Sequence, residues 1–156
     1  MKATDVSRWD SLDRIIDRIG AADALSEDLW ADIMAGAAVR LAAMPRQAAV
    51  SRLNRFAASG AWVDAAFVLI EVELAAWRLR RIDYDDGEWR CALSRAPDLP
   101  EWLDHAVEAS HRDLALALVM VAIDTMREVR SHHEQRSVSV PQTRAGDRNY
   151  VCCDNF

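Results

Sequence analysis

The sequence predicts a mainly helical α+β fold, in which several N-terminal helices precede one β-hairpin at about residues 76–95 that packs on a long C-terminal helix at about 111–134. Three observations lead to this prediction. Apolar residues recur at helical spacing on both sides of the hairpin. Residues 77–95 instead alternate apolar with charged side chains around Asp85-Asp86-Gly87. The length of 156 residues, 51% of them hydrophobic, suits one domain with a sizeable core.

We expect a single globular domain over residues 1–134, with a helical part at 1–59 and a helix–hairpin–helix part at 60–134. Residues 135–156 contain several serines, Pro141 and Gly146 and show no hydrophobic periodicity. Such a segment buries too little apolar surface to fold alone, so we expect a flexible tail.

The first two helices are amphipathic and have recognisable ends. The first should follow Ser7, which can act as a cap with Asp10 three residues on, and stop at Gly20. The second should begin at Ser26, and Pro45 marks the next boundary. Their apolar residues are Leu12, Ile15, Ile16 and Ile19 in the first helix and Leu29, Trp30, Ile33, Met34, Ala37 and Leu41 in the second.

Two more helices are expected before the hairpin. The segment from Pro45 to Ser59 has Leu53 and Phe56 as apolar anchors, and Gly60 then interrupts the pattern. Helical spacing resumes in the residues Trp62, Ala65, Ala66, Leu69, Ile70 and Glu73.

We predict the register of the hairpin from the positions of its apolar residues. Those before and after the turn all have odd numbers, so they share one face only if the loop has an odd number of residues. Asp85 and Asp86 would form a type I turn, and Gly87 would take the left-handed position without steric cost. The apolar face would then hold Trp77, Leu79, Trp89, Cys91 and Leu93. The opposite face would hold Arg78, Arg80, Ile82, Tyr84, Glu88, Arg90, Ala92 and Ser94.

After Pro97 and Pro100 we expect a short turn or helix around Trp102. Ser110, with Asp113 three residues later, then forms a capping pattern for the long helix. That helix presents a broad apolar stripe suited to the hairpin's apolar face: Leu114, Ala117, Leu118, Val121, Ala122, Thr125 and Val129.

A family resemblance covers roughly the second half of the chain. The residues that carry it are Ala65, Trp77-Arg78-Leu79, the Asp-Gly turn, Trp89-Arg90-Cys91-Ala92-Leu93, Glu108-Ala109-Ser110 and Leu114-Ala115-Leu116-Ala117-Leu118. This pattern resembles small phage and prophage proteins of unknown function with an α-β-β-α sandwich. The resemblance implies that fold and a bacterial mobile-element setting, and it brings no catalytic residues with it.

Composition narrows the functional classes. The formal net charge is −6 and Lys2 is the only lysine, a bias that suggests a high-GC bacterial genome and disfavours a wholly basic nucleic-acid binder. No signal peptide is visible, and the apolar run at 114–123 is too short for a membrane span. The three cysteines form no disulfide framework. We therefore expect a cytoplasmic protein without a membrane partner.

Candidate catalytic and metal-binding motifs have simpler interpretations. The carboxylates at 83–88 do not have EF-hand spacing and are expected to form a solvated turn. Ser110, His111 and Asp113 lie too close in sequence to converge as a triad. No zinc-site spacing is present among His105, His111, His132, His133, Cys152 and Cys153. We expect no metal site and no cofactor, and incidental thiols in the tail.

Two features point to binding. Arg78, Arg80 and Arg90, with Tyr84 beside them, form a surface that can hold phosphates or an acidic partner, or can simply face water. Among six tryptophans, Trp9 and Trp102 are flanked by charges and are the expected exposed anchors.

These observations favour a non-enzymatic protein-interaction module of mobile-element type, which binds another protein or itself and acts, in one variant, as an inhibitor or immunity-like protein. A first alternative is an accessory protein that binds nucleic acid through the arginine face. A second is a small enzyme that uses His105 or His111 with Asp104 or Glu108, between the hairpin and the last helix.

Overall fold

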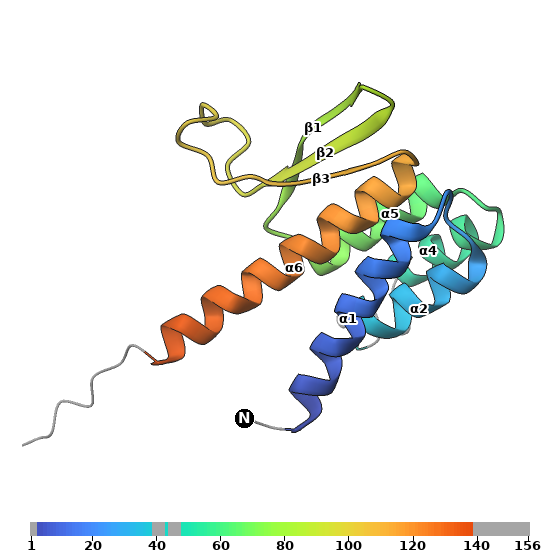
Figure 1. Cartoon of the computed structure of the whole chain (residues 1–156), viewed down its shortest axis with the longest axis horizontal. Helices are drawn as coiled ribbons and strands as arrows, with labels where there is room; N and C mark the ends of the chain where they lie inside the picture. Colours follow the sequence, from blue (N-terminus) through green and yellow to red (C-terminus); the bar gives the residue numbers. More distant parts are fainter. Residues whose placement is uncertain (1–2, 39–42, 44–47, 139–156) are drawn as a thin grey trace, which may run out of the picture.

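The computed structural model describes the backbone of residues 3–38, 43 and 48–138, and the side chains of residues 12–38, 43 and 48–132 (Figure 1). Its helices are α1 (Ala3–Ala21), α2 (Glu27–Ala37), α4 (Ala48–Ala58), α5 (Trp62–Glu73) and α6 (Leu114–Val138). Its strands β1 (Arg78–Asp85), β2 (Glu88–Ser94) and β3 (Val107–His111) form an antiparallel sheet in that order. The predicted mainly helical α+β fold is confirmed.

Helix α6 lies at the centre of the molecule, with the sheet along one side and α5 and α1 along the other (Figure 1). Its first half is apolar on every side, as expected of a helix buried all round. The buried residues are Ala115, Leu116, Ala117, Leu118, Val119, Val121, Ala122 and Ile123. Within the described part of the chain, no helix combines the length and apolar character needed to cross a bilayer.

The N-terminal helices form a layer against α5 and α6. The predicted start of α2 is confirmed, because the Ser26 hydroxyl accepts a hydrogen bond from the Leu29 amide at 3.3 Å. The predicted cap at Ser7 is wrong, since α1 begins four residues earlier, at Ala3. Trp30 of α2 and Trp62 of α5 pack together with ring centroids 5.9 Å apart.

The predicted hairpin forms, but its turn is shorter than the parity argument required. Asp85 pairs with Glu88, so the loop has two residues, Asp86 and Gly87, with φ of 51° and 86°. Positive φ at both positions is the signature of a type I′ turn, whose twist suits a β-hairpin. An aspartate followed by a glycine is well suited to these two conformations.

A bulge at Arg80 keeps the apolar residues on one face despite the even loop. Arg80 has no cross-strand partner, whereas the pairs around it are Leu79 with Leu93, Arg81 with Ala92, Ile82 with Cys91 and Tyr84 with Trp89. The inner face of the sheet therefore holds Leu79, Ile82, Tyr84, Trp89, Cys91, Leu93, Val107 and Ala109. Ile82 and Tyr84 were predicted on the opposite face, and that placement is wrong.

Strand β3 and the start of α6 also differ from the prediction. Residues 107–111 pair with β2, and the predicted helix start at His111 is the end of this strand. Ser110 is not a cap, because its hydroxyl donates to Glu88 on the sheet at 3.0 Å. Asp113 caps α6 instead, by accepting a hydrogen bond from the Leu116 amide at 2.9 Å. Helix α6 ends at Val138, so the predicted tail starts inside it, and residues 139–156 lie outside the described part.

Candidate functional site: a cavity and a His–Glu–His cluster beside the 95–106 loop

The loop of residues 95–106 connects β2 to β3 and is held to the sheet by Arg80. The Arg80 guanidinium donates to the carbonyls of Pro97 at 3.1 Å and Leu99 at 2.9 Å, and to the Asp104 carboxylate at 2.5 Å. Because Arg80 is the bulged residue, its side chain reaches this loop while its neighbours keep the regular alternation. One side chain thus fixes three points of the loop.

Asp104 anchors the loop from within. Its side chain is only 3% exposed and that of Arg80 15%, so their ion pair is largely shielded from water. The second carboxylate oxygen of Asp104 accepts a hydrogen bond from Ser94 at 2.6 Å, and the Ser94 hydroxyl in turn accepts one from the Ala96 amide at 2.9 Å. A buried carboxylate with each oxygen satisfied is a stable anchor for the loop.

The loop presents apolar side chains to solvent. Trp102 is 81% exposed, Leu103 55% and Leu99 43%, and we call these three residues the apolar patch. Scattered exposed apolar residues are ordinary, but three of them on one braced loop of twelve residues are a candidate binding surface. The sequence prediction that Trp102 is an exposed aromatic residue agrees with this placement.

A cavity of about 630 Å³ lies between the loop, the end of α5 and the outer half of α6. This volume is in the range of ligand pockets, roughly 300–1,000 Å³. Leu99 and Leu103 of the apolar patch line it together with Leu74 and Trp77. Its polar lining consists of Glu73, Arg95, Asp104, His105, Glu128 and His132.

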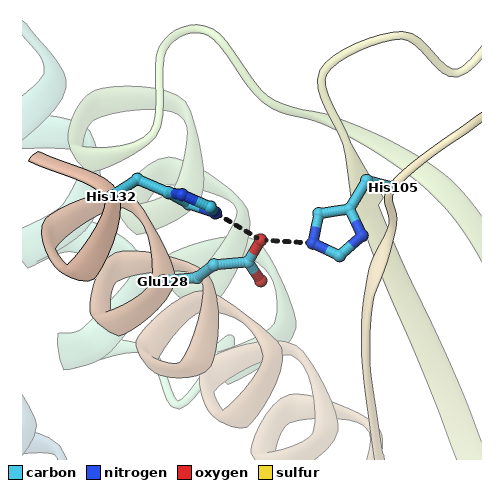
Figure 2. Close-up of side chains that lie close together, drawn as sticks. All are labelled: His105, Glu128 and His132. Carbon is cyan, nitrogen blue, oxygen red and sulfur yellow. Dashed lines mark ion pairs between the residues drawn. The ribbon is translucent and has the colours of Figure 1, made fainter. Parts of the chain in front are cut away.

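Three of these polar residues form a cluster at the cavity (Figure 2). Glu128 and His132 lie one turn apart on α6, and His105 reaches them from the loop. The Nε2 atoms of His105 and His132 lie 2.7 Å and 3.7 Å from the same Glu128 oxygen, Oε1. The three ligand atoms are all within 4.8 Å of one another. Both imidazoles are exposed and Glu128 is partly buried.

The sequence analysis missed this cluster for an identifiable reason. It considered only the spacings between histidines and cysteines. The spacing that matters is that of Glu128, four residues before His132, which puts both side chains on one helix face. The third member, His105, joins them only because α6 follows β3 and runs back alongside it (Figure 1). The spacing of residues along the chain does not show how these elements pack. The pair Glu128 and His132 could therefore be found from the sequence, whereas His105 could not.

The predicted arginine face is not a free basic surface. Arg78 donates to the carbonyls of Ala75 and Trp77, and Arg90 pairs with Asp85 at 3.2 Å. Arg80 is committed to the 95–106 loop. Arg81, which the prediction omitted, contacts three carboxylates, those of Asp83, Glu101 and Glu108.

Tyr84 is separated from those arginines, on the inner face of the sheet, where its ring lies 5.0 Å from that of Trp89. Trp9, the other predicted anchor, has a side chain outside the described residues. The predicted binding residues therefore do not form one surface, and Trp102 is the member that lies at the cavity's loop.

Two other candidate groups are structural. His111 is buried, with Nε2 3.1 Å from the Ile19 carbonyl and Nδ1 accepting from the Asp113 amide at 3.0 Å, so it links α1 to the start of α6. Burial raises the pKa of the Cys91 thiol to about 11, and the nearby Asp83 charge adds to the shift. A thiol in that state is a poor nucleophile.

The residues of the enzyme alternative are divided by the fold. Asp104 and His105 both line the cavity, but Asp104 is held by Arg80 and Ser94. Glu108 is on the outer face with Arg81. The described residues that line the cavity include no serine, threonine, cysteine or lysine.

Family models, curated proteins and solved structures were all compared with the chain, and none of them matches it.

Proposed function

We propose that the chain is a non-enzymatic protein-binding module whose contact surface is the apolar patch and the adjoining cavity. The observation that carries this proposal is Trp102, which is 81% exposed on a loop fixed by a buried ion pair. A loop that is already held in place before binding loses less conformational entropy on association. Tryptophan is also among the residues that most often dominate binding energy.

The partner's chemistry follows from the charges around the patch. Asp98 and Glu101 are exposed on the same loop, where Arg81 of β1 pairs with Glu101 at 3.3 Å and Arg95 is exposed at the start of the loop. With a net charge of −6 for the chain, this surface suits a protein that inserts an apolar side chain into the cavity and surrounds it with basic residues. An inhibitor or immunity-like role toward a basic enzyme is the finer form of the proposal.

The nucleic-acid alternative is less well supported. Phosphate binding needs arginines that are free to face the backbone of the nucleic acid. Arg80, Arg81 and Arg90 instead pair with carboxylates of the same chain. These contacts favour a protein partner over a nucleic acid.

The test is to capture partners from host lysate with the tagged chain and then measure the affinity of any captured protein for two purified variants. Trp102→Ala should weaken binding by roughly thirtyfold or more, the loss expected for a central hot-spot residue. Tyr84→Ala is the matched control. It also removes an exposed aromatic ring, but at the turn end of the hairpin, whereas Trp102 lies on the loop that follows the other end.

Three results would contradict the proposal. One is a partner that binds Trp102→Ala as tightly as the original chain, which places the contact elsewhere. Another is a complex that Tyr84→Ala weakens more than Trp102→Ala. The third is a purified chain that self-associates in light scattering through Trp102, which makes the patch a homo-oligomer interface.

A further inference from the structure

We propose that His105, Glu128 and His132 form a binding site for a divalent transition-metal ion of the zinc type. The proposal is independent of the protein-binding function, because it concerns residues that bind the ion without any partner. It also goes against the expectation from sequence spacing that the chain has no metal site.

The geometry is the first support. Two imidazole nitrogens and one carboxylate oxygen converge, with N to O distances of 2.7 Å and 3.7 Å and all ligand atoms within 4.8 Å of one another (Figure 2). Ligands of one tetrahedral Zn²⁺ ion, at about 2.0–2.1 Å from the metal, lie roughly 3.3 Å apart. The 2.7 Å and 3.7 Å separations lie on either side of that spacing.

The second support for the proposal is the backbone that holds the three ligands. Glu128 and His132 are four residues apart on α6, so successive turns of one helix hold them on the same side. His105 follows Asp104 directly, and Asp104 is fixed by Arg80 and Ser94. Ligands on braced elements lose less conformational entropy on binding an ion than ligands on a loose loop.

The chemistry of the ligands selects the ion. Imidazole favours zinc, copper, nickel and iron over calcium or magnesium, which prefer sites made of oxygen atoms alone. Two neutral imidazoles and one carboxylate are a common protein ligand set for zinc when further positions are left to water or to a bound molecule. All three residues line the cavity, so a molecule bound in the cavity would lie beside the ion.

The surrounding charges are compatible with a cation. The ionisable groups that line the cavity beside the cluster are Glu73 from α5, and Arg95 and Asp104 from the loop. Asp104 is already neutralised by Arg80. Arg95 is exposed, so water screens its repulsion of an ion.

The simpler interpretation is that the two histidines only interact with the Glu128 carboxylate, with His105 Nε2 at 2.7 Å and His132 Nε2 at 3.7 Å from Oε1. In that case the side chains interact with one another and have no affinity for metal beyond that of scattered surface histidines. A direct metal titration separates the two interpretations.

The experiment uses the full chain, freed of metal by a chelator and kept reduced, and titrated with CoCl₂ and then ZnCl₂. We expect visible absorption bands of protein-bound Co²⁺ that saturate at one equivalent and disappear when Zn²⁺ displaces the cobalt. His105→Ala, Glu128→Gln and His132→Ala should each lower the affinity by more than about tenfold, because even outer-shell partners contribute that much. Acid should release the ion, since protonated imidazole cannot ligate.

Two control variants accompany the metal titration. Glu108→Gln removes an exposed carboxylate on the outer face of the sheet and should leave metal affinity unchanged. Replacing Cys152 and Cys153 with serine tests whether tail thiols bind the ion, and should also have no effect. Circular dichroism checks that each variant is folded.

The proposal is overturned if the three cluster variants bind metal as tightly as the original chain. It is equally overturned if the cysteine replacement abolishes the saturable binding, or if no saturable binding is found at all. Because no partner protein is present, none of these results bears on the role of Trp102.

Discussion

Asp104 is the residue on which the position of the 95–106 loop depends. Its two carboxylate oxygens connect Arg80 of β1 and Ser94 of β2 to the loop, and it is almost fully buried. The sequence analysis considered Asp104 only as a candidate catalytic carboxylate and not as an anchor, because its partner Arg80 lies 24 residues earlier in the chain. Nothing local distinguishes Asp104 from the exposed Asp98 on the same loop.

Replacing Asp104 with asparagine should destabilise the protein by about 3 kcal/mol, because it leaves the largely buried Arg80 without its counter-charge. The measurement is the free energy of unfolding from urea denaturation followed by circular dichroism. Asp98→Asn is the control and should change it by less than about 0.5 kcal/mol, as an exposed substitution does. Equal effects of the two substitutions would mean that the ion pair contributes little.

At the scale of elements, the start of α6 shows what sequence patterns can and cannot identify. A capping residue was expected before an apolar helix, and one is present, but it is Asp113 and not Ser110. The misassignment arose because β3 has only five residues, Val107–His111, and offers too short an alternation to be recognised. The hairpin, with longer strands and an Asp-Gly turn, was identified correctly in position.

Asp113→Ala should destabilise the protein by about 1 kcal/mol, the usual contribution of a helix cap. Ser110→Ala, which removes only an exposed hydrogen bond to Glu88, should have a smaller effect. Thermal unfolding of the two variants side by side distinguishes the caps. A larger loss for Ser110→Ala would restore the assignment made from sequence.

For the whole molecule, the helical α+β class could be predicted because it depends on periodicity that is visible in the chain. The cavity and the His–Glu–His cluster could not, because they arise where the loop, α5 and α6 meet. Helix α6 contacts the sheet, α5 and α1, so one element joins the parts predicted at 1–59 and 60–134.

This central position of α6 predicts one cooperative unfolding transition. The midpoints reported by far-ultraviolet circular dichroism, which follows the helices, and by tryptophan fluorescence should coincide. Most of the described tryptophans are buried or half-buried, in both the helices and the sheet. Two separate transitions would show that the N-terminal helices form an independent folding unit.

The bulge at Arg80 has a consequence for how this hairpin tolerates changes in length. Leu79 and Arg81 pair with the adjacent residues Leu93 and Ala92, so Arg80 is an insertion relative to a regular ladder. Deleting it would leave every other side chain on its present face, while the 95–106 loop would lose its three hydrogen bonds from β1. Removal of this one residue should therefore detach the loop while the strand pairing stays the same. The loop can change in sequence without a change in the sheet.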